Sequence, residues 1–520
     1  MLSAMSTRIS IIALCLLAFC MGLIWEYSAL PSLESRSPSS ALFDTARTRL
    51  GRAISPRVDA HPGKSGIYPL PNAHDAFAAR ALLAQAAERT LDVQYYIWRK
   101  DMTGTLLFEA LHAAANRGVR VRLLLDDNNT SGLDTMLAAL DSHPHIEVRL
   151  FNPFVIRKPR LLGYLTDFSR LNRRMHNKSF TADNQATIIG GRNIGDEYFG
   201  ATEGVLFVDL DVMAVGPVVT EVSKDFDRYW ASASSYPIAR LLPPADPAML
   251  AEIAAAAPLI EQDPAAAAYT STLRHSSFVR DLIEGKLPLE WAAVRMISDD
   301  PAKGLGLAAP DTLLPYKLEK IIGKPKTDME LVSAYFVPTA AGVDWFTALT
   351  GRDVRVKVLT NSFEATDVAI VHAGYAKRRR ALLKAGITLY ELRRLSPERG
   401  ASKSAGPIGS SASSLHAKTF SVDQHCVFIG SFNFDPRSAK LNTELGFVID
   451  SPVLAQQIKA ALDSSVPASA YEVHLSDTGQ LYWIEHQKRK RVRHNTEPGT
   501  SFWQRAGIRF LSWLPIEWLL

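Results

Sequence analysis

Apolar residues recur with two alternating periods in the first half of the chain. Residues 76–89 and 104–116 show the three-to-four-residue spacing of helices that bury one face. Residues 91–98 and 119–125 are short runs rich in branched and aromatic residues, which is typical of strands. This alternation of helix and strand predicts an α/β fold with a mostly parallel sheet and helices on its faces.

The same order of elements begins again near residue 328. Three segments of the second half match segments of the first: 330–337 matches 91–98, 354–359 (VRVKVL) matches 119–124 (VRVRLL), and 381–392 matches 136–151. A repeat of this length predicts two tandem α/β/α domains, residues 67–235 and 307–480, which form a pseudo-dimer around one active site. Residues 236–306, rich in Ala and Pro, are expected to connect the domains and to shape the substrate mouth.

Each half ends in the same motif. Residues 176–183 read HNKSFTAD and residues 416–423 read HAKTFSVD, and an asparagine follows each histidine at the same distance, Asn193 and Asn433. Side chains two apart on a strand share a face, so the His and Lys of each motif point the same way. The Ala-Asp-Asn and Val-Asp-Gln steps are typical of turns into a second strand, so each motif is predicted to be a hairpin.

These residue types suit phosphoryl transfer. Imidazole can attack phosphorus or carry a proton near neutral pH, and ammonium and carboxamide groups can hold phosphate oxygens. Two hairpins facing each other would form one symmetric phosphate site; the alternative is two unrelated hairpins with surface His and Lys. The first copy has Gly191 where the second has Ser431, so a hydroxyl contact is expected from the second half alone. The candidate catalytic residues are His176, Lys178, Asp183, His416, Lys418 and Asp423, and the candidate phosphate ligands are Asn193, Asn433 and Ser431.

A catalytic histidine also needs an acceptor that fixes its second nitrogen. Eight residues before Pro217 and Pro452, at equivalent places in the two halves, lie Asp209 and Glu444. We expect these two carboxylates to orient the histidines. Asp211 is an alternative to Asp209 because both share a strand face, and a solvated carboxylate at a strand edge is the structural alternative for either.

The paired motifs resemble the HKD motif of the phospholipase D superfamily. Within it, residues 92–98, 174–178 and 514–520 resemble the bacterial cardiolipin synthase C group, and the likeness extends from about residue 67 to the end. This resemblance implies that a phosphatidyl group moves between phospholipids through a phosphohistidine at His176, without a metal or another cofactor. It implies phosphatidylglycerol as acceptor, with phosphatidylethanolamine as a further candidate substrate.

Three other functions are consistent with the motifs. A hydrolytic phospholipase D would use water as acceptor, and a phosphodiesterase or nuclease would act on a nucleic-acid backbone. A non-enzymatic membrane scaffold would not need two intact motifs. The net charge of +5 is too small to indicate a nucleic-acid partner, and 47% apolar with 21% charged residues is typical of a globular protein.

The terminal segments suggest a membrane location. Residues 9–25 form an uncharged, largely apolar run, so residues 1–31 are expected to anchor the protein in the inner (cytoplasmic) membrane, with its side unassigned. Alternatives are a cleaved signal, a lipoprotein modified at Cys20, or a core helix. Residues 32–66 are expected to be a tether, 399–414 a mobile loop, and the basic and aromatic residues 481–520 a tail that contacts the membrane or docks on the core.

Two further patterns bear on ligands. The basic and aromatic stretch 154–175 suits lipid phosphates beside acyl chains, or a solvated loop. Cys15 and Cys20 fall in the apolar run, which leaves Cys426 as the only cysteine beyond it. No disulfide within a domain and no cysteine-based metal site is therefore expected.

Overall fold

The computed structural model describes residues 22, 28–201, 206–246, 248–262, 266–267, 269–271, 276–366, 368–394, 413–487, 490–515 and 517–520. The predicted anchor run 9–25 lies outside these residues except for Gly22, and the predicted loop 399–414 lies outside them except for its last two residues. Among the described helices, none has the length and apolarity that crossing a membrane requires.

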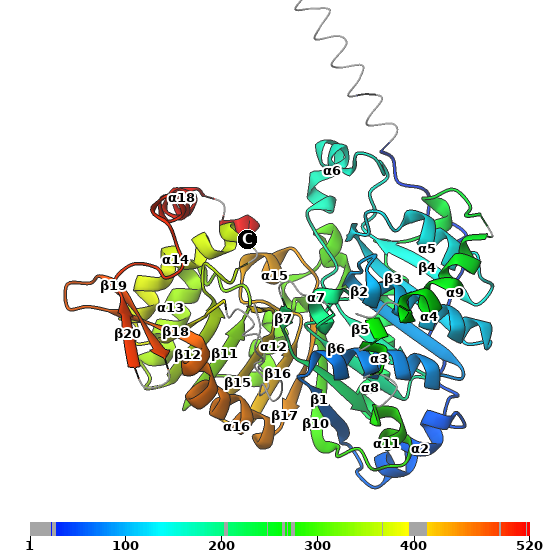
Figure 1. The fold of residues 1–520 in the computed structure, drawn as a ribbon, viewed down its shortest axis with the longest axis horizontal. Helices are drawn as coiled ribbons and strands as arrows, with labels where there is room; N and C mark the ends of the chain where they lie inside the picture. The colour runs from blue at the N-terminus through cyan, green and yellow to red at the C-terminus, as the bar shows by residue number, and fades with distance from the viewer. Residues whose placement is uncertain are drawn as a thin grey trace, which may run out of the picture.

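Two lobes of similar architecture lie side by side (Figure 1). The strands of the first are β1 (Ser65–Leu70), β2 (Thr90–Ile97), β3 (Arg120–Asn129), β4 (Ile146–Phe151), β5 (Ser179–Ala182), β6 (Ala186–Gly190), β8 (Asp211–Val215) and β9 (Ser235–Pro237). Those of the second are β10 (Glu290–Ser298), β11 (Asp328–Ser333), β12 (Arg355–Asn361), β13 (Thr388–Leu392), β15 (Lys418–Val422), β16 (Cys426–Gly430), β17 (Leu445–Asp450) and β18 (Ala470–Leu475).

Strand pairing joins the lobes into one sheet with internal pseudo-symmetry. In the first lobe the order is β9-β4-β3-β2-β5-β6-β8-β1, and in the second it is β18-β13-β12-β11-β15-β16-β17-β10. The two halves meet where β1 pairs antiparallel with β10. This matched order confirms the predicted repeat.

The sheet is mixed rather than mostly parallel. Only β2, β3 and β4, and likewise β11, β12 and β13, run parallel to one another; the motif hairpins and the strands at the lobe junction are antiparallel. The prediction of a mostly parallel sheet is therefore corrected. Only the parallel strands need crossover connections through helices. Short hairpin loops are enough to join the antiparallel strands.

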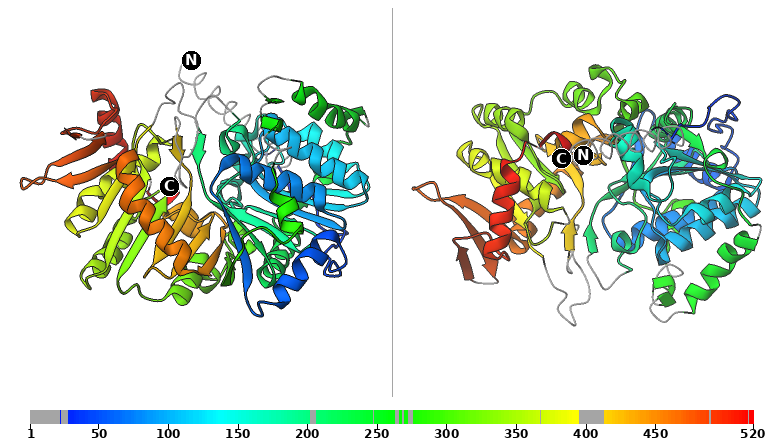
Figure 2. Two further views of the ribbon diagram at one scale, coloured as in Figure 1. Left: turned by 60° about the horizontal axis from the view of Figure 1, so that its bottom comes forward. Right: turned by 90° about the horizontal axis from the view of Figure 1, so that it is seen from above.

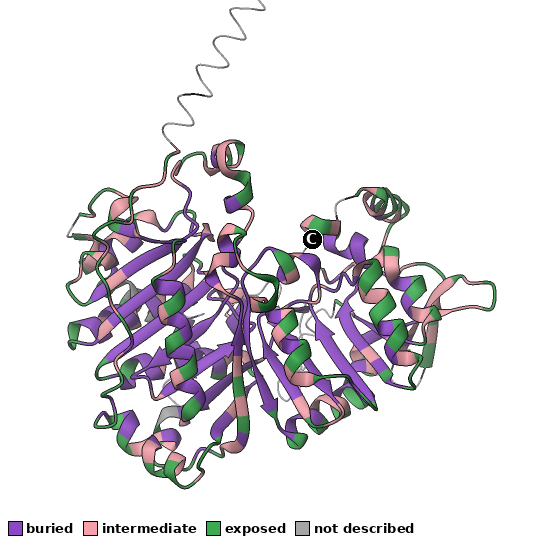
Figure 3. Ribbon diagram, turned by 180° about the vertical axis from the view of Figure 1, so that it is seen from behind, coloured by how far each residue is buried: buried purple, intermediate pink, exposed green. Residues whose placement is uncertain are grey.

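Helices cover both faces of each half of the sheet (Figures 1 and 3). They are α3 (Ala73–Ala86), α4 (Met102–Asn116), α5 (Asp134–Asp141) and α8 (Pro217–Trp230) in the first lobe, and α12 (Leu314–Ile322), α13 (Thr339–Thr350), α14 (Ala369–Lys384) and α16 (Pro452–Ala460) in the second. In the first core, Phe77 of α3 and Phe108 of α4 are fully buried with Val93 and Leu123 of the strands. Figure 3 shows the strands as the most continuously buried part of the molecule.

The predicted tether 32–66 is instead packed on the first lobe. Its helix α2 (Arg49–Asp59) is capped by the Thr48 hydroxyl and buries Leu50 and Ile54. Further upstream, the Arg36 guanidinium donates to the backbone carbonyls of Ala231, Ser232 and Ser235. Few apolar residues are enough to hold this segment because the partly buried Arg36 and the backbone carbonyls that accept from it supply the other contacts.

The predicted connector and tail also contribute to the lobes. Within 236–306, α9 (Ala248–Glu261) and α11 (Phe278–Ile283) pack on the first lobe, and β10 forms the central pairing. After residue 480, β19 (Leu481–Gln487) and β20 (Lys490–His494) extend the second sheet. Helix α18 (Phe502–Trp513) then lies beside α14. Between the lobes, β7 (Leu206–Val208) pairs with β14 (Ser413–Leu415), the teal and yellow strands of Figure 2.

Candidate active site

The two motifs form hairpins, as predicted, in β5–β6 and β15–β16. Each turns through two residues of positive φ: Asp183 and Asn184 in the first, Asp423 and Gln424 in the second. Consecutive residues of this conformation match the twist of antiparallel strands. The turn chemistry therefore fixes the register that aligns each His-Lys pair.

The motif aspartates hold these turns and do not line the cavity between the lobes. The Asp183 carboxylate accepts the backbone N–H groups of Glu88, Arg89 and Thr90, at the start of β2. Asp423 accepts the corresponding N–H groups before β11, those of residues 326, 327 and 328. Their surroundings correct the expectation of a direct catalytic role, because each carboxylate is already committed to three backbone donors.

Asp183→Ala should therefore lower stability rather than remove a reacting group. Three backbone N–H groups, one buried and two partly buried, would lose their acceptor, and we expect the free energy of unfolding to fall by about 2–4 kcal/mol. Denaturant unfolding monitored by circular dichroism measures this change. A variant as stable as the parent would contradict the assignment.

Asp423 provides a pH-dependent comparison. Burial opposes ionisation, but the N–H groups of Thr327, Lys326 and Asp328 outweigh it and lower the pKa of this carboxyl. The stabilisation from Asp423 is thus present above the unfolded pKa of about 4 and is lost as pH falls through the lower, folded pKa.

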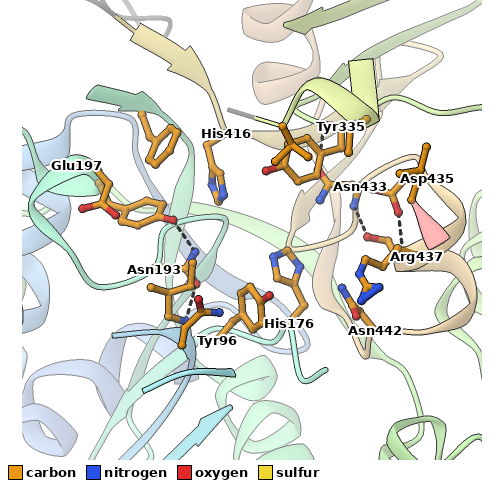
Figure 4. Close-up of a pocket in the computed structure, with 18 of the residues that line it drawn as sticks. Tyr96, His176, Asn193, Glu197, Tyr335, His416, Asn433, Asp435, Arg437 and Asn442 are labelled. Carbon is orange, nitrogen blue, oxygen red and sulfur yellow. Dashed lines mark hydrogen bonds between the residues drawn. The ribbon is translucent and has the colours of Figure 1, made fainter. Parts of the chain in front are cut away.

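Both motif histidines face one cavity of about 690 Å³ at the junction of the lobes (Figure 4). His176 lies just before β5 and His416 between β14 and β15, so each lobe contributes one. Backbone bonds cross the junction at both places: the N–H of His176 donates to Thr443, and that of His416 donates to Val208. The site is thus assembled from both halves.

The orienting carboxylates are exchanged between the lobes. Nδ1 of His176 lies 2.8 Å from Oε2 of Glu444, and Nδ1 of His416 lies 2.5 Å from Oδ2 of Asp209. Both carboxylates are buried. Because Nδ1 is engaged, Nε2 is the nitrogen of each ring that can meet a substrate. Asp211, the alternative to Asp209, instead accepts from Arg80 at 2.7 Å.

The motif lysines are buried and bond back to the histidine backbone. Nζ of Lys178 lies 2.6 Å from the carbonyl oxygen of His176, and Lys418 contacts the carbonyl and Nδ1 of His416. Burial lowers the pKa of Lys178 well below its ordinary value, although Glu444 acts against this. Each ammonium group therefore lies close to the histidine of its own motif.

The two asparagines line the cavity, each fixed through its side-chain oxygen. Oδ1 of Asn193 accepts the N–H of Ile97 at 3.2 Å and its Nδ2 donates to Tyr198, whereas Oδ1 of Asn433 accepts the N–H of Tyr335 at 3.4 Å. These bonds orient the amide groups in the cavity wall. The carboxamide N–H₂ groups are the donors that a phosphate oxygen would meet.

Ser431 departs from its expected role as a phosphate ligand. Its hydroxyl donates to Oε2 of Glu444 at 2.5 Å and accepts the N–H of Leu445 at 3.0 Å. In the first lobe a Cβ on Gly191 would come within 2.0 Å of Asp209 Oδ1. The Gly/Ser difference thus follows the Asp/Glu difference: glycine leaves room for Asp209, and serine holds Glu444.

The electrostatics of the two His–carboxylate pairs differ. Burial and the neighbouring lysines lower the pKa of His176 well below its ordinary value. Burial raises the pKa of Glu444 to about 7. By contrast, burial is outweighed at Asp209, where His416 and Lys418 hold the pKa of the carboxyl well below its usual range. The His176 pair therefore favours a neutral imidazole. Burial and Lys418 also lower the pKa of His416, but here the ionised Asp209 acts against them and supports the protonated imidazole.

Several residues around the histidines escaped sequence analysis. Tyr96 contacts His176 edge-on at 4.9 Å between ring centroids, and Tyr198 and Phe207 contact His416 at 5.2 and 5.1 Å. Leu519 and Leu520 line the cavity from the far end of the chain. Tyr96, Leu519 and Leu520 lie in segments that carry the family resemblance, which was their only signal; nothing local marks Tyr198 and Phe207.

A buried ion pair supports Glu444 from behind. Oδ2 of Asp299 accepts the N–H of Glu444 at 2.9 Å and the ammonium of Lys303 at 2.8 Å. Lys303 also donates to the carbonyl of Ser438, a residue of the cavity wall. Sequence analysis placed this part of the connector at the substrate mouth; it stabilises the backbone of the site instead.

A family profile described as "Cardiolipin synthase, PLD-like domain" matches residues 80–230 and 318–466, one match in each lobe, and each match contains a motif and a carboxylate partner. The chain belongs to the phospholipase D superfamily. Within this superfamily, cardiolipin synthase C of Escherichia coli (strain K12) is 53% identical over 472 residues, which cover 91% of this chain and all of that protein. These matches confirm the family resemblance.

Two more distant similarities are found, one in sequence and one in fold. Cardiolipin synthase B of Escherichia coli (strain K12) is 23% identical over 75% of this chain and 78% of its own. The crystal structure of phosphatidylserine synthase from Haemophilus influenzae Rd KW20 matches with a TM-score of 0.57 and 14% identity, covering 91% of this chain and all of that one. The latter likeness supports the two-lobed architecture.

Proposed function

We propose that the protein is a phosphatidyltransferase of cardiolipin synthase type, which moves a phosphatidyl group from one phospholipid to a hydroxyl of phosphatidylglycerol. The observation that carries this proposal is the single cavity with two histidines, each bonded through Nδ1 to a carboxylate of the other lobe. The 53% identity to a cardiolipin synthase C over its whole length supports the choice of reaction.

The first displacement loads the enzyme. Nε2 of neutral His176 attacks phosphorus, the bond from phosphorus to the leaving alkoxide breaks, and His416 gives that oxygen its Nε2 proton. In the second displacement neutral His416 takes the proton of the incoming hydroxyl. The oxygen of that hydroxyl attacks phosphorus and the P–N bond to His176 breaks. His176 is then neutral and His416 protonated, as at the start.

Charge on the phosphoryl oxygens is assigned to the motif cations and amides. Lys178 and Lys418 need only rotate about their flexible side chains to exchange a backbone carbonyl for a phosphate oxygen, and Asn193 and Asn433 already present amide donors. In this proposal Asp209 and Glu444 position the histidines. Asp183 and Asp423 position the hairpins.

The cavity wall favours a lipid over a nucleic-acid substrate. Besides the polar groups, it carries an apolar side formed by Phe207, Val368, Ile370, Val371, Leu519 and Leu520. Such a surface suits the glycerol ester and upper acyl segments of a phospholipid, whereas a nucleotide chain calls for stacking and basic contacts along its backbone. Phosphatidylethanolamine is a second substrate for comparison.

We expect purified protein in detergent micelles to form cardiolipin from phosphatidylglycerol alone or mixed with phosphatidylethanolamine. EDTA should leave the rate unchanged, because lysine and asparagine supply the stabilisation that a metal would give. Thin-layer chromatography of labelled lipids separates the products. Phosphatidic acid as the sole product would indicate a hydrolase, and a rate that EDTA removes and a divalent ion restores would contradict metal independence.

We infer an inner-membrane location for this reaction. The E. coli relative and the lipid chemistry support membrane association, and the apolar run 9–25 is the proposed anchor.

A further inference from the structure

Each lobe exposes a short apolar stripe at helical spacing. The first runs from η1 (Arg160–Leu162) into α6 (Gly163–Leu171) and consists of Leu161, Leu165 and Phe168, which are 49–75% exposed. The second, on α18 and η6 (Glu517–Leu519), consists of Trp503, Phe510, Trp513 and Trp518, which are 58–80% exposed. Apolar side chains grouped in this way and this exposed are typical of a surface that contacts a membrane or another molecule.

Both stripes lie on one side of the molecule, at the cavity. Figure 1 shows α6 and α18 rising from different lobes on the same side, with the C-terminal segment between them. That segment lines the cavity through Leu519 and Leu520. On the other side, Asn172 directly after α6 accepts from Arg437, another cavity residue, at 2.7 Å. The stripes thus flank the mouth of the site.

Basic residues accompany the aromatic stripe. Lys377 and Arg380 of α14 and Arg505 and Arg509 of α18 line a groove together with Phe502, Phe510 and Trp513. Glu517 neutralises part of this charge through Lys377 and Arg378, but Arg380 and Arg509 remain exposed. Tryptophan beside arginine is the combination that suits the headgroup region of a bilayer with anionic lipids.

We propose that α6 with η1 and α18 with η6 dock together on the surface of an anionic phospholipid bilayer, with the cavity mouth facing the lipid. The inference rests on the proposed function, since it takes the cavity to receive lipid. Docking at two points on either side of the mouth lets a phospholipid pass from the membrane to His176 and His416 without crossing water. In Figure 1 the dark blue segment at the start of the coloured chain also lies on this side.

The test compares two physical forms of one substrate. Phosphatidylglycerol in vesicles requires docking, whereas a short-chain phosphatidylglycerol below its critical micelle concentration does not. Trp503→Ser with Phe510→Ser, and separately Leu161→Ser with Leu165→Ser, should lower turnover on vesicles about tenfold and leave turnover of the monomeric lipid unchanged. Val453→Ser is the control, because Val453 is 55% exposed on α16, at the opposite side in Figure 1.

The outcomes separate this inference from the proposed function. If parent and stripe variants turn over vesicles equally, the docking face is overturned. It is also overturned if the stripe variants lose as much turnover on the monomeric lipid as on vesicles, because the stripes would then act in the reaction itself. Absence of transfer with both substrates in the parent overturns the proposed function instead. A parent dimer that the stripe variants dissociate, measured by sedimentation, would assign the face to a second copy and not to lipid.

Fluorescence gives a readout that is independent of turnover. Brominated phosphatidylglycerol quenches tryptophan at the depth of its bromine atoms, and Trp503→Phe with Trp513→Phe and Trp518→Phe keeps the face apolar while removing these fluorophores. Quenching by vesicles should fall in this variant and stay unchanged in Trp345→Phe, whose side chain lines a separate groove between α12 and α13. If brominated vesicles quench the triple Trp→Phe variant as strongly as the parent, the docking face is overturned.

Discussion

Replacing His416 by alanine should give an enzyme that cleaves one donor molecule and then stops. With phosphatidyl-p-nitrophenol as donor, the leaving phenolate departs without a proton, so the first displacement needs only His176 and the groups around phosphorus. The second displacement needs a base for the incoming hydroxyl, and that base is absent. We expect a burst of nitrophenolate equal to the enzyme concentration, followed by a stall.

His176→Ala should give no burst, and steady turnover should fall by about 10⁴-fold or more in both variants. Mass spectrometry of stalled His416→Ala protein should find the phosphatidyl group on His176. His425→Ala is a matched control, because His425 is an exposed histidine of the same hairpin and pairs with Asp450. An adduct on His416 in the His176→Ala variant would reverse the assignment of nucleophile and acid.

The assignment has a physical basis that the motifs alone do not provide, since the two copies carry the same His, Lys, Asp and Asn at the same spacing. Their environments differ because the partner carboxylates differ in length and packing. Glu444 is buried, accepts from the Ser431 hydroxyl and donates its N–H to Asp299; its raised pKa favours a neutral His176. Asp209, beside His416, stays ionised. The two equivalent motifs therefore supply different groups: His176 is the nucleophile, and His416 is the acid and base.

The local features of the site could be predicted from sequence. Equal spacing in two copies indicated the hairpins, and counting back from Pro217 and Pro452 located Asp209 and Glu444. What spacing could not reveal is that each carboxylate serves the histidine of the other lobe. That exchange depends on the pairing of β1 with β10, which is a contact between segments more than 200 residues apart.

Predictions from composition were less successful where buried surface is small. Residues 32–66 are polar on average, yet Leu50 and Ile54 bury one face of α2 and Arg36 finds three backbone acceptors. Strands of about five residues, such as β6 and β16, are apolar at nearly every position, so their periodicity does not distinguish parallel from antiparallel pairing. The place of Leu520 in the cavity wall has no signal in the hydrophobic pattern, because its segment stands out only through the family resemblance.

The two orienting carboxylates should respond differently to pH. Because burial raises the pKa of Glu444 to about 7, this carboxyl takes up a proton as pH falls through neutrality. Protonated Glu444 is a weaker acceptor for the Nδ1–H of His176 and can itself donate to Nδ1, so the tautomer that directs Nε2 at phosphorus is no longer favoured. His176 itself stays neutral there, since its pKa lies well below the ordinary value. Turnover should therefore decline on the acid side with an apparent pKa of about 7.

Glu444→Gln removes the titrating group, and an amide is a poorer partner for imidazole. We expect turnover to fall by about 10²–10⁴-fold and the acid limb near pH 7 to disappear.

Asp209→Asn should lower turnover by a similar factor but retain that limb. Its effect belongs on the basic side: without the carboxylate, the pKa of His416 falls, so the protonated acid is lost at lower pH and the basic limb moves down. The rate profiles of the two variants between pH 5 and 9 distinguish these changes. An acid limb that survives in Glu444→Gln would belong to another group, and a basic limb unmoved in Asp209→Asn would separate His416 from proton donation to the leaving alcohol.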